Sequence, residues 1–155
     1  MNHSLLMITL LVSSVGLTMP KIAYAQEDAC QAVVDEAIYS IERLPNISIP
    51  STGVFEISDI YRNPPPNRTM GLYIGMEGSA VDNVFNSPVL MEDIATSIFD
   101  ACNLAGMVEF GIYRAGFSYQ IGWSNNGSII FDCVRDDWHS SGETQINWGQ
   151  QICGI

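Results

Sequence analysis

The densest group of polar side chains in the sequence lies between Asp132 and His139. Carboxylates that lie close together bind hard cations such as Ca²⁺, and His139 is the one histidine after residue 25. Asp136, Asp137 and His139 are therefore our candidate metal ligands. The stretch lacks the D-x-[DN]-x-[DN]-G spacing of an EF-hand loop. A solvated turn, in which Arg135 offsets part of the acid charge, is the interpretation we favour.

A hydrolase is the second chemistry that this stretch permits. His139 with Asp136 or Asp137 could form the acid–base pair that activates a serine nucleophile such as Ser140 or Ser141. No G-x-S-x-G nucleophile elbow is present, and the chain after residue 25 contains no lysine. We therefore expect no cofactor and favour a non-enzymatic protein. A small secreted hydrolase or a divalent-cation-binding protein that uses this region is the alternative.

Aromatic side chains indicate a third kind of site, a contact surface for a protein or a carbohydrate. The alternation along residues 70–76 and 108–113 places Tyr73 and Tyr113 on one face of a sheet and the apolar residues on the other. That face also carries three glycines, Gly71, Gly75 and Gly111. Tyr73, Tyr113 and Trp138 are our candidate contact residues. The alternative is that a terminal segment of the chain covers this face.

The four cysteines, Cys30, Cys102, Cys133 and Cys153, predict two disulfides in an oxidising compartment. A zinc site is disfavoured, because its cysteines usually form close pairs and here the gaps are 72, 31 and 20 residues. Spacing alone does not choose among the three possible pairings. We prefer Cys30 with Cys102, which would join two helices, and Cys133 with Cys153, which would close the C-terminal tail.

Two amphipathic helices are predicted. Residues 28–44 place apolar side chains at intervals of three and four, with acids between them, and Pro45 follows. The second helix is predicted to start at Ser87-Pro88, because serine is a common N-cap residue and proline is common in the first turn. Its apolar stripe extends as far as Cys102.

Strands are predicted between and after the helices. A loop over residues 46–53 precedes strands at 54–61, 70–76, 108–112 and 117–124, and the three prolines at 64–66 form an exposed connector. A three-residue turn at 125–127 pairs Ile121 with Phe131. We expect one α+β domain in which two helices pack on one face of a four- to five-stranded, mainly antiparallel sheet, with two disulfides.

The N-terminal residues predict export. Residues 5–19 carry no charge, and a small-x-small triplet follows at 23–25, which is typical of a cleavable signal peptide. The apolar run is shorter than the roughly 20 residues of a membrane span. We expect cleavage before Gln26 and a mature chain, residues 26–155, in the periplasm or outside the cell.

The mature chain would be strongly acidic, because residues 26–155 contain five Arg, no Lys and seventeen Asp plus Glu, a net charge of −12. Such a surface repels phosphate backbones and anionic lipid headgroups. Nucleic acid and, after signal cleavage, membrane are therefore not expected as partners. The expected partner is therefore a protein or a carbohydrate.

Short segments spread over most of the mature chain resemble small secretory proteins of cyanobacteria that have no assigned function. The resemblance implies a bacterial periplasmic or extracellular setting and carries over no catalytic residue. The segments are Arg68-Thr69-Met70 through Gly78, Asn86-Ser87-Pro88 with the helix that ends at Cys102, Phe110, the Asn-Gly hairpin, Phe131-Asp132-Cys133, and Trp148-Gly149 with Cys153.

Overall fold

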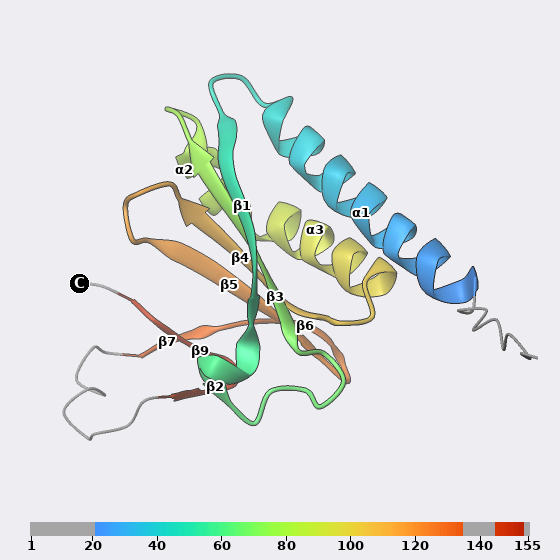
Figure 1. Ribbon diagram of the computed structural model, residues 1–155. Helices are drawn as coiled ribbons and strands as arrows, with labels where there is room; N and C mark the ends of the chain where they lie inside the picture. The colour runs from blue at the N-terminus through green and yellow to red at the C-terminus, as the bar shows by residue number, and fades with distance from the viewer. Residues whose placement is uncertain (1–20, 135–144, 154–155) are drawn as a thin grey trace, which may run out of the picture.

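A computed structural model of the protein describes residues 21–134 and 145–153. Its centre is a five-stranded sheet in the order β1-β3-β4-β5-β6 (Figure 1). Neighbouring strands are antiparallel except β3 and β4, which are parallel because the chain between them crosses one face of the sheet as helices. The strands are β1 (Ser48–Glu56), β3 (Met70–Glu77), β4 (Ala105–Ile112), β5 (Ser118–Ser124) and β6 (Gly127–Ile130).

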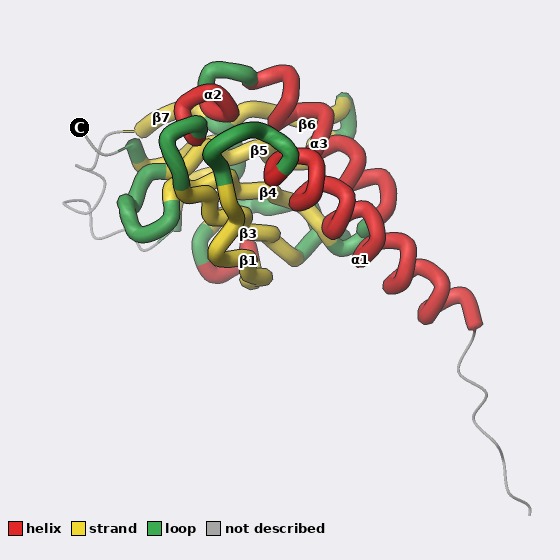
Figure 2. The backbone as a smooth tube through the Cα atoms, turned by 90° about the horizontal axis from the view of Figure 1, so that it is seen from above, coloured by secondary structure: helices red, strands yellow, loops and turns green. Residues whose placement is uncertain are grey.

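Two long helices, α1 (Lys21–Glu42) and α3 (Pro88–Ala101), pack on one face of this sheet (Figure 2). The short α2 (Val81–Phe85) precedes α3. The main core lies between the helices and the sheet, which confirms the predicted α+β class with both helices on one face. Its buried side chains include Ala37, Ile41, Leu72, Ile74, Met76, Met91, Ile98, Val108, Phe110 and Ile121.

A smaller apolar cluster covers one end of the opposite sheet face. Met107 of β4 belongs to it, whereas the next residue, Val108, faces the helices. The rings of Tyr61, Phe131 and Trp148 meet edge to face in this cluster, with centroids 4.9 to 5.4 Å apart. The short elements around it are η1 (Ile57–Asp59), β2 (Tyr61–Arg62), β7 (Asp132–Val134), β8 (Ile146–Asn147) and β9 (Gln150–Ile152).

The predicted helices are present, and one begins earlier than expected. α3 begins at Pro88 after Ser87, as predicted, although the Ser87 side chain makes no capping hydrogen bond. α1 begins at Lys21, inside the segment expected to be removed before Gln26. Cleavage at that point would shorten the helix by five residues. Its new first turn would contain two acids, which the positive end of a helix favours.

The predicted loop over residues 46–53 is wrong, because β1 already begins at Ser48. The register of β1 against β3 shifts between Ser48 and Ser51, where Pro50 lies. Proline lacks an N–H and is tolerated in a strand at a sheet edge or a bulge, and β1 is an edge strand of the sheet. The presence of Pro50 therefore hid the first half of the strand from the sequence pattern.

The β5–β6 hairpin differs by one residue from the predicted register. Ser124 pairs with Gly127, so the turn has two residues instead of three. The predicted pairing of Ile121 with Phe131 is wrong, since Ile121 pairs with Ile130. Phe131 instead enters the smaller cluster on the opposite face. Ile130, which lies opposite Ile121 in place of Phe131, is 39% exposed, so an apolar pattern that requires two buried partners favours the wrong register.

Both preferred disulfides are present. Cys30 in α1 is bonded to Cys102 at the end of α3, with 4.7 Å between the two Cα atoms. Cys133 in β7 is bonded to Cys153 after β9, with 5.3 Å between the Cα atoms. The first bond therefore fixes one helix to the other, and the second holds the C-terminal strand pair together.

Loss of Cys30–Cys102 should destabilise the fold more than loss of Cys133–Cys153. In the loop-entropy description, a bond that closes 72 residues contributes on the order of 4 kcal/mol and one that closes 20 residues about 3 kcal/mol. Urea unfolding of the C30A/C102A and C133A/C153A variants measures both contributions. An equal or larger loss in C133A/C153A would contradict this order.

Candidate functional site

A groove lies between the first half of α1 and the sheet. α1 runs obliquely to β1, so the two elements diverge toward the N-terminal end of the helix (Figure 1). The groove has a volume of about 720 Å³, and we call it the α1 groove. It is lined by Glu27, Cys30, Gln31 and Val34 of α1, Val54 of β1, Met70, Gly71 and Leu72 of β3, and Ile98 and Cys102 through Ala105 at the end of α3.

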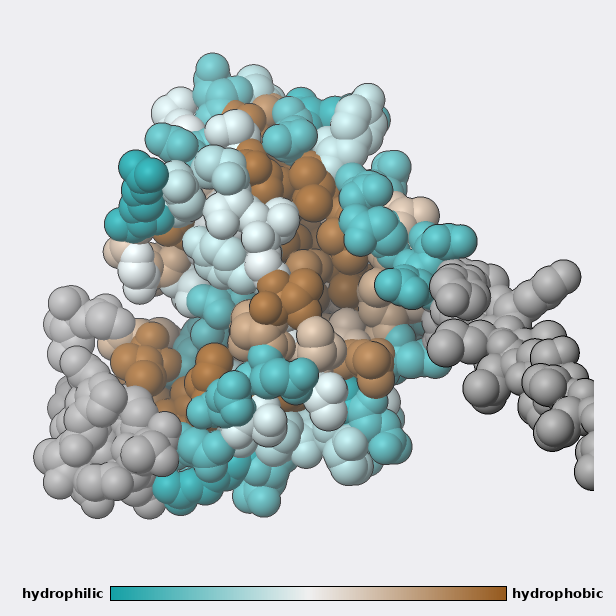
Figure 3. Space-filling model, viewed as in Figure 1, coloured by the Kyte–Doolittle hydropathy of each residue, from teal (hydrophilic) through white to brown (hydrophobic). Residues whose placement is uncertain are grey.

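The lining of the α1 groove is mainly apolar. Val54 on one side is 62% exposed and Leu104 on the other is 59% exposed, while Leu72 and Ile98 between them are buried. Apolar side chains accordingly show at the surface between β1 and α1 (Figure 3). Two large aliphatic side chains that face water across a buried apolar floor are typical of a contact surface.

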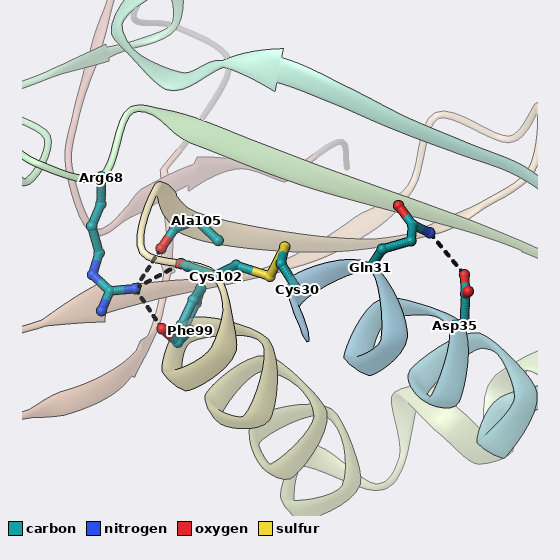
Figure 4. The surroundings of a disulfide bond; sticks show 7 residues. All are labelled: Cys30, Gln31, Asp35, Arg68, Phe99, Cys102 and Ala105. Atoms are coloured by element: carbon teal, nitrogen blue, oxygen red, sulfur yellow. Dashed lines mark hydrogen bonds between the residues drawn. A yellow bond between two sulfur atoms is a disulfide. The ribbon is translucent and has the colours of Figure 1, made fainter. Parts of the chain in front are cut away.

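Arg68 holds together the end of α3, which forms one side of the α1 groove (Figure 4). Its Nη1 donates hydrogen bonds to the carbonyl oxygens of Phe99 at 2.8 Å, Cys102 at 3.3 Å and Ala105 at 2.8 Å. The last carbonyls of a helix have no partners within it, and a cation there is favoured by the helix dipole. Burial lowers the pKa of Arg68, and the Asp100 carboxylate opposes this effect.

A second, smaller depression of about 400 Å³ is lined in part by Arg68. The Arg68 guanidinium stacks on the ring of Trp123, with 4.5 Å between its carbon and the ring centroid. The proline connector, Asn103, Asn125 and Leu104 complete the lining, so Leu104 borders both depressions. Trp123 packs against the main core. Because one face of Trp123 carries Arg68, this stacking serves mainly to hold the cation in place.

The predicted contact residues Tyr73 and Tyr113 lie at the opposite sheet face. Tyr73, Glu109 and Gln120 are register partners in a row across β3, β4 and β5. Burial raises the pKa of Tyr73, and the nearby Glu109 and Tyr113 raise it further. Tyr113 follows β4 and carries the guanidinium of Arg114 on its ring, 4.8 Å from the centroid.

The glycines of this face are not exposed as we expected. The Tyr73 ring lies on Gly75 and Gly111, where an added Cβ would come within 2.8 and 2.5 Å of ring atoms. The Phe55 ring covers Gly71 in the same way. The missing side chains therefore make room for rings of the protein itself, and the exposed part of the face is smaller than the alternation predicts.

The predicted metal ligands Asp136, Asp137 and His139, and the predicted contact residue Trp138, lie outside the described residues. Within residues 21–134 and 145–153, no group of three or more His, Cys, Asp or Glu side chains is arranged to hold a metal ion. In the same ranges, no helix is long and apolar enough to cross a membrane.

No protein-family model, curated protein or solved structure matches the chain. The α1 groove was missed at the level of sequence, because Val54 and Leu104 are 50 positions apart and each reads as part of the core. One available signal was the pair Pro50 and Val54 in the same strand. A proline within a strand indicates a sheet edge, where an apolar side chain such as Val54 can remain exposed.

Replacement of Arg68 tests its role at the end of α3. Arg68→Met removes three hydrogen bonds to backbone carbonyls and should lower the free energy of unfolding by about 2 to 3 kcal/mol. Arg68→Lys keeps the charge near the helix end but cannot reproduce the guanidinium stack on Trp123, so we expect an intermediate loss. Urea denaturation followed by tryptophan fluorescence measures both. A Met variant as stable as the parent would show that the carbonyls are satisfied without Arg68.

Alkaline pH should destabilise the fold through Tyr61. This residue is 2% exposed and its hydroxyl donates a hydrogen bond to Gln120 Oε1 at 2.5 Å. Burial, with Glu109 as the second cause, raises its pKa well above 10. The unfolded chain therefore releases a proton near pH 10 that the folded chain retains. The contribution of Tyr61 to the free energy of unfolding is thus complete below pH 10 and decreases as the pH rises above it.

Tyr61→Phe keeps the ring and removes the titrating hydroxyl. Its free energy of unfolding should fall less steeply above pH 10 than that of the parent, in denaturation curves recorded from pH 8 to 11.5. Parallel pH profiles for the two proteins would show that Tyr61 does not cause the alkaline loss.

Proposed function

We propose that the protein is an exported, non-enzymatic domain that binds an apolar segment of a partner protein in the α1 groove. One observation carries this proposal, namely that Val54 and Leu104 face water on opposite sides of a groove whose floor is buried and apolar. The groove volume lies in the range of sites that bury small ligands or a few side chains.

The exposed apolar side chains of the α1 groove would supply part of the energy of specific binding. Complete burial of a Val or Leu side chain contributes about 1.5 to 3 kcal/mol. Because Val54 is 62% exposed and Leu104 59%, covering both would contribute on the order of 2 to 4 kcal/mol, before the partner's own apolar side chains are counted. Binding also costs translational and side-chain freedom. A few central apolar anchors of this kind are the usual source of affinity at protein interfaces.

Export is supported by the two disulfides, which persist in oxidising compartments, and by the apolar run at residues 5–19 with its small-x-small triplet. The acidic composition keeps such a protein in solution and disfavours anionic partners.

A protein partner is favoured over a carbohydrate by the chemistry of the two surfaces. The α1 groove is lined mainly by aliphatic side chains, whereas sugars need aromatic faces and many hydrogen-bonding groups. The Tyr73 ring that would serve a sugar is packed on Gly75 and Gly111. No described residue favours the hydrolase or cation-binding alternative over a binding role.

A matched set of valine and leucine substitutions tests the proposed function. Peptides selected from a random library on the oxidised protein should be rich in apolar residues. They should bind Val54→Asp and Leu104→Asp at least about tenfold more weakly, a loss of about 1.4 kcal/mol. Val89→Asp is the control, because Val89 is 68% exposed at the start of α3, outside the α1 groove.

Fluorescence anisotropy of the labelled peptides gives the affinities, and circular dichroism checks that each variant is folded. Peptides that bind the two groove variants as tightly as the parent, or that lose affinity equally for Val89→Asp, would overturn the proposed function.

A further inference from the structure

Within residues 21–134 and 145–153, no strand pairs with the outer side of β1 next to the α1 groove. β1 stands at the edge of the sheet, and the Ile57 N–H donates to the Thr69 carbonyl at 2.9 Å. In an antiparallel ladder, alternate residues direct their backbone groups to the same neighbour. Residues 51, 53, 55 and 57 therefore face β3. The N–H and C=O groups of residues 52, 54 and 56 point away from the sheet, and no described residue bonds to them.

The side chains of these three residues face the same side as the α1 groove. Val54 is the register partner of Leu72, which belongs to the main core beneath the helices. Side chains alternate along a strand, so Thr52 and Glu56 point to the same face as Val54. A strand placed beside β1 would thus bond to residues 52, 54 and 56 and direct every second side chain toward the groove.

The open edge has a defined upper limit. The Ile49 N–H donates to the Glu42 carboxylate of α1 at 3.3 Å, and Pro50 has no N–H to donate. An added strand would therefore pair over residues 52–56 and stop below Pro50. Five residues of antiparallel strand span about 17 Å, which sets the length of the segment that fits.

The charge around this edge is negative, because the Glu42 carboxylate lies at Ile49 near its upper end and Glu56 lies at its lower end. Glu27 lines the groove, Glu56 is exposed at the end of β1, and no Lys or Arg is among the residues that line the groove. Residues 26–155 carry a net charge of −12. A segment with basic residues on either side of its apolar positions is attracted to this surface, and an acidic one is repelled.

We propose that the partner segment binds as an extended strand that adds to the outer edge of β1, with alternate apolar side chains in the α1 groove and Lys or Arg at its ends. The partner class is a protein with an unpaired or disordered segment of about five to seven residues. This inference rests on the proposed function and specifies how the same groove recognises its partner. A helix in the groove would leave the β1 backbone unused.

The test uses a short synthetic peptide with valine at alternate positions, threonine between them and two arginines at each end. Two derivatives carry N-methyl groups, one on the valines and one on the threonines. N-methylation removes N–H donors but leaves the side chains in place. One derivative should bind the oxidised full chain at least about tenfold more weakly than the parent peptide, and the other should bind nearly as well.

The sensitive derivative also reports the direction of the added strand. In an antiparallel pair, residues that bond to each other lie directly opposite, with their side chains on the same face. A loss of affinity on N-methylation of the valines therefore indicates an antiparallel strand. In a parallel pair, each residue of β1 bonds to the two residues that flank the one opposite it. A loss of affinity on N-methylation of the threonines therefore indicates a parallel strand. Equal affinities of the two derivatives would overturn addition to β1.

Two further peptides separate this inference from the proposed function. With glutamates in place of arginines, binding should weaken at least about tenfold at low salt, and equal affinity would overturn the requirement for basic ends. A helical peptide of the same composition is the second. If it alone binds, and Leu104→Asp abolishes that binding, the strand mode is wrong and the groove function stands. If neither peptide binds, both proposals are wrong.

Discussion

The position of α1 depends on the bond between Cys30 and Cys102. The C-terminal half of α1 is held by buried Ala37 and Ile41, whereas Cys30, Val33 and Val34, nearer its start, are partly buried. The disulfide is the covalent tie in the first half of the helix, and its other end is the residue whose carbonyl accepts a hydrogen bond from Arg68. α1 is thus fastened to α3 while it diverges from β1 (Figures 1 and 4). The α1 groove is the space that this divergence leaves open.

Much of the fold was predictable because its signals are local. Helical periodicity identified α1 and α3, and Ser87-Pro88 identified the start of α3. Period-two alternation identified β3 and β4. The failures occurred where a single residue contradicted the pattern or where the pattern pointed to the wrong partner. Pro50 concealed the first half of β1. In the hairpin, the apolar pattern selected the buried Phe131 as the partner of Ile121, but the partner is Ile130, which is exposed.

The candidate site was much less predictable, since it depends on distances between elements. Val54 and Leu104 acquire meaning only when the sheet and the turn after α3 bring them to one groove. The glycines beside Tyr73 were expected on an open contact face, but the Tyr73 ring lies on Gly75 and Gly111. Titratable residues, which attract attention first in a sequence, have no part in the groove apart from Glu27 at its rim. A site built from aliphatic side chains has no sequence signature that distinguishes it from a core.

The open edge of β1 has a consequence for how the molecules behave toward one another. An unpaired strand edge is a template for the same edge of a second copy, and such pairing leads to aggregation unless something opposes it. Pro50 shortens the usable edge, and Glu56 places a charge at its end. Two copies that approach each other also bring together two large negative charges, whose repulsion weakens as salt screens it. The negative charge of the chain thus opposes self-association through β1. This repulsion is weakest at high ionic strength, where pairing of two β1 edges is least opposed.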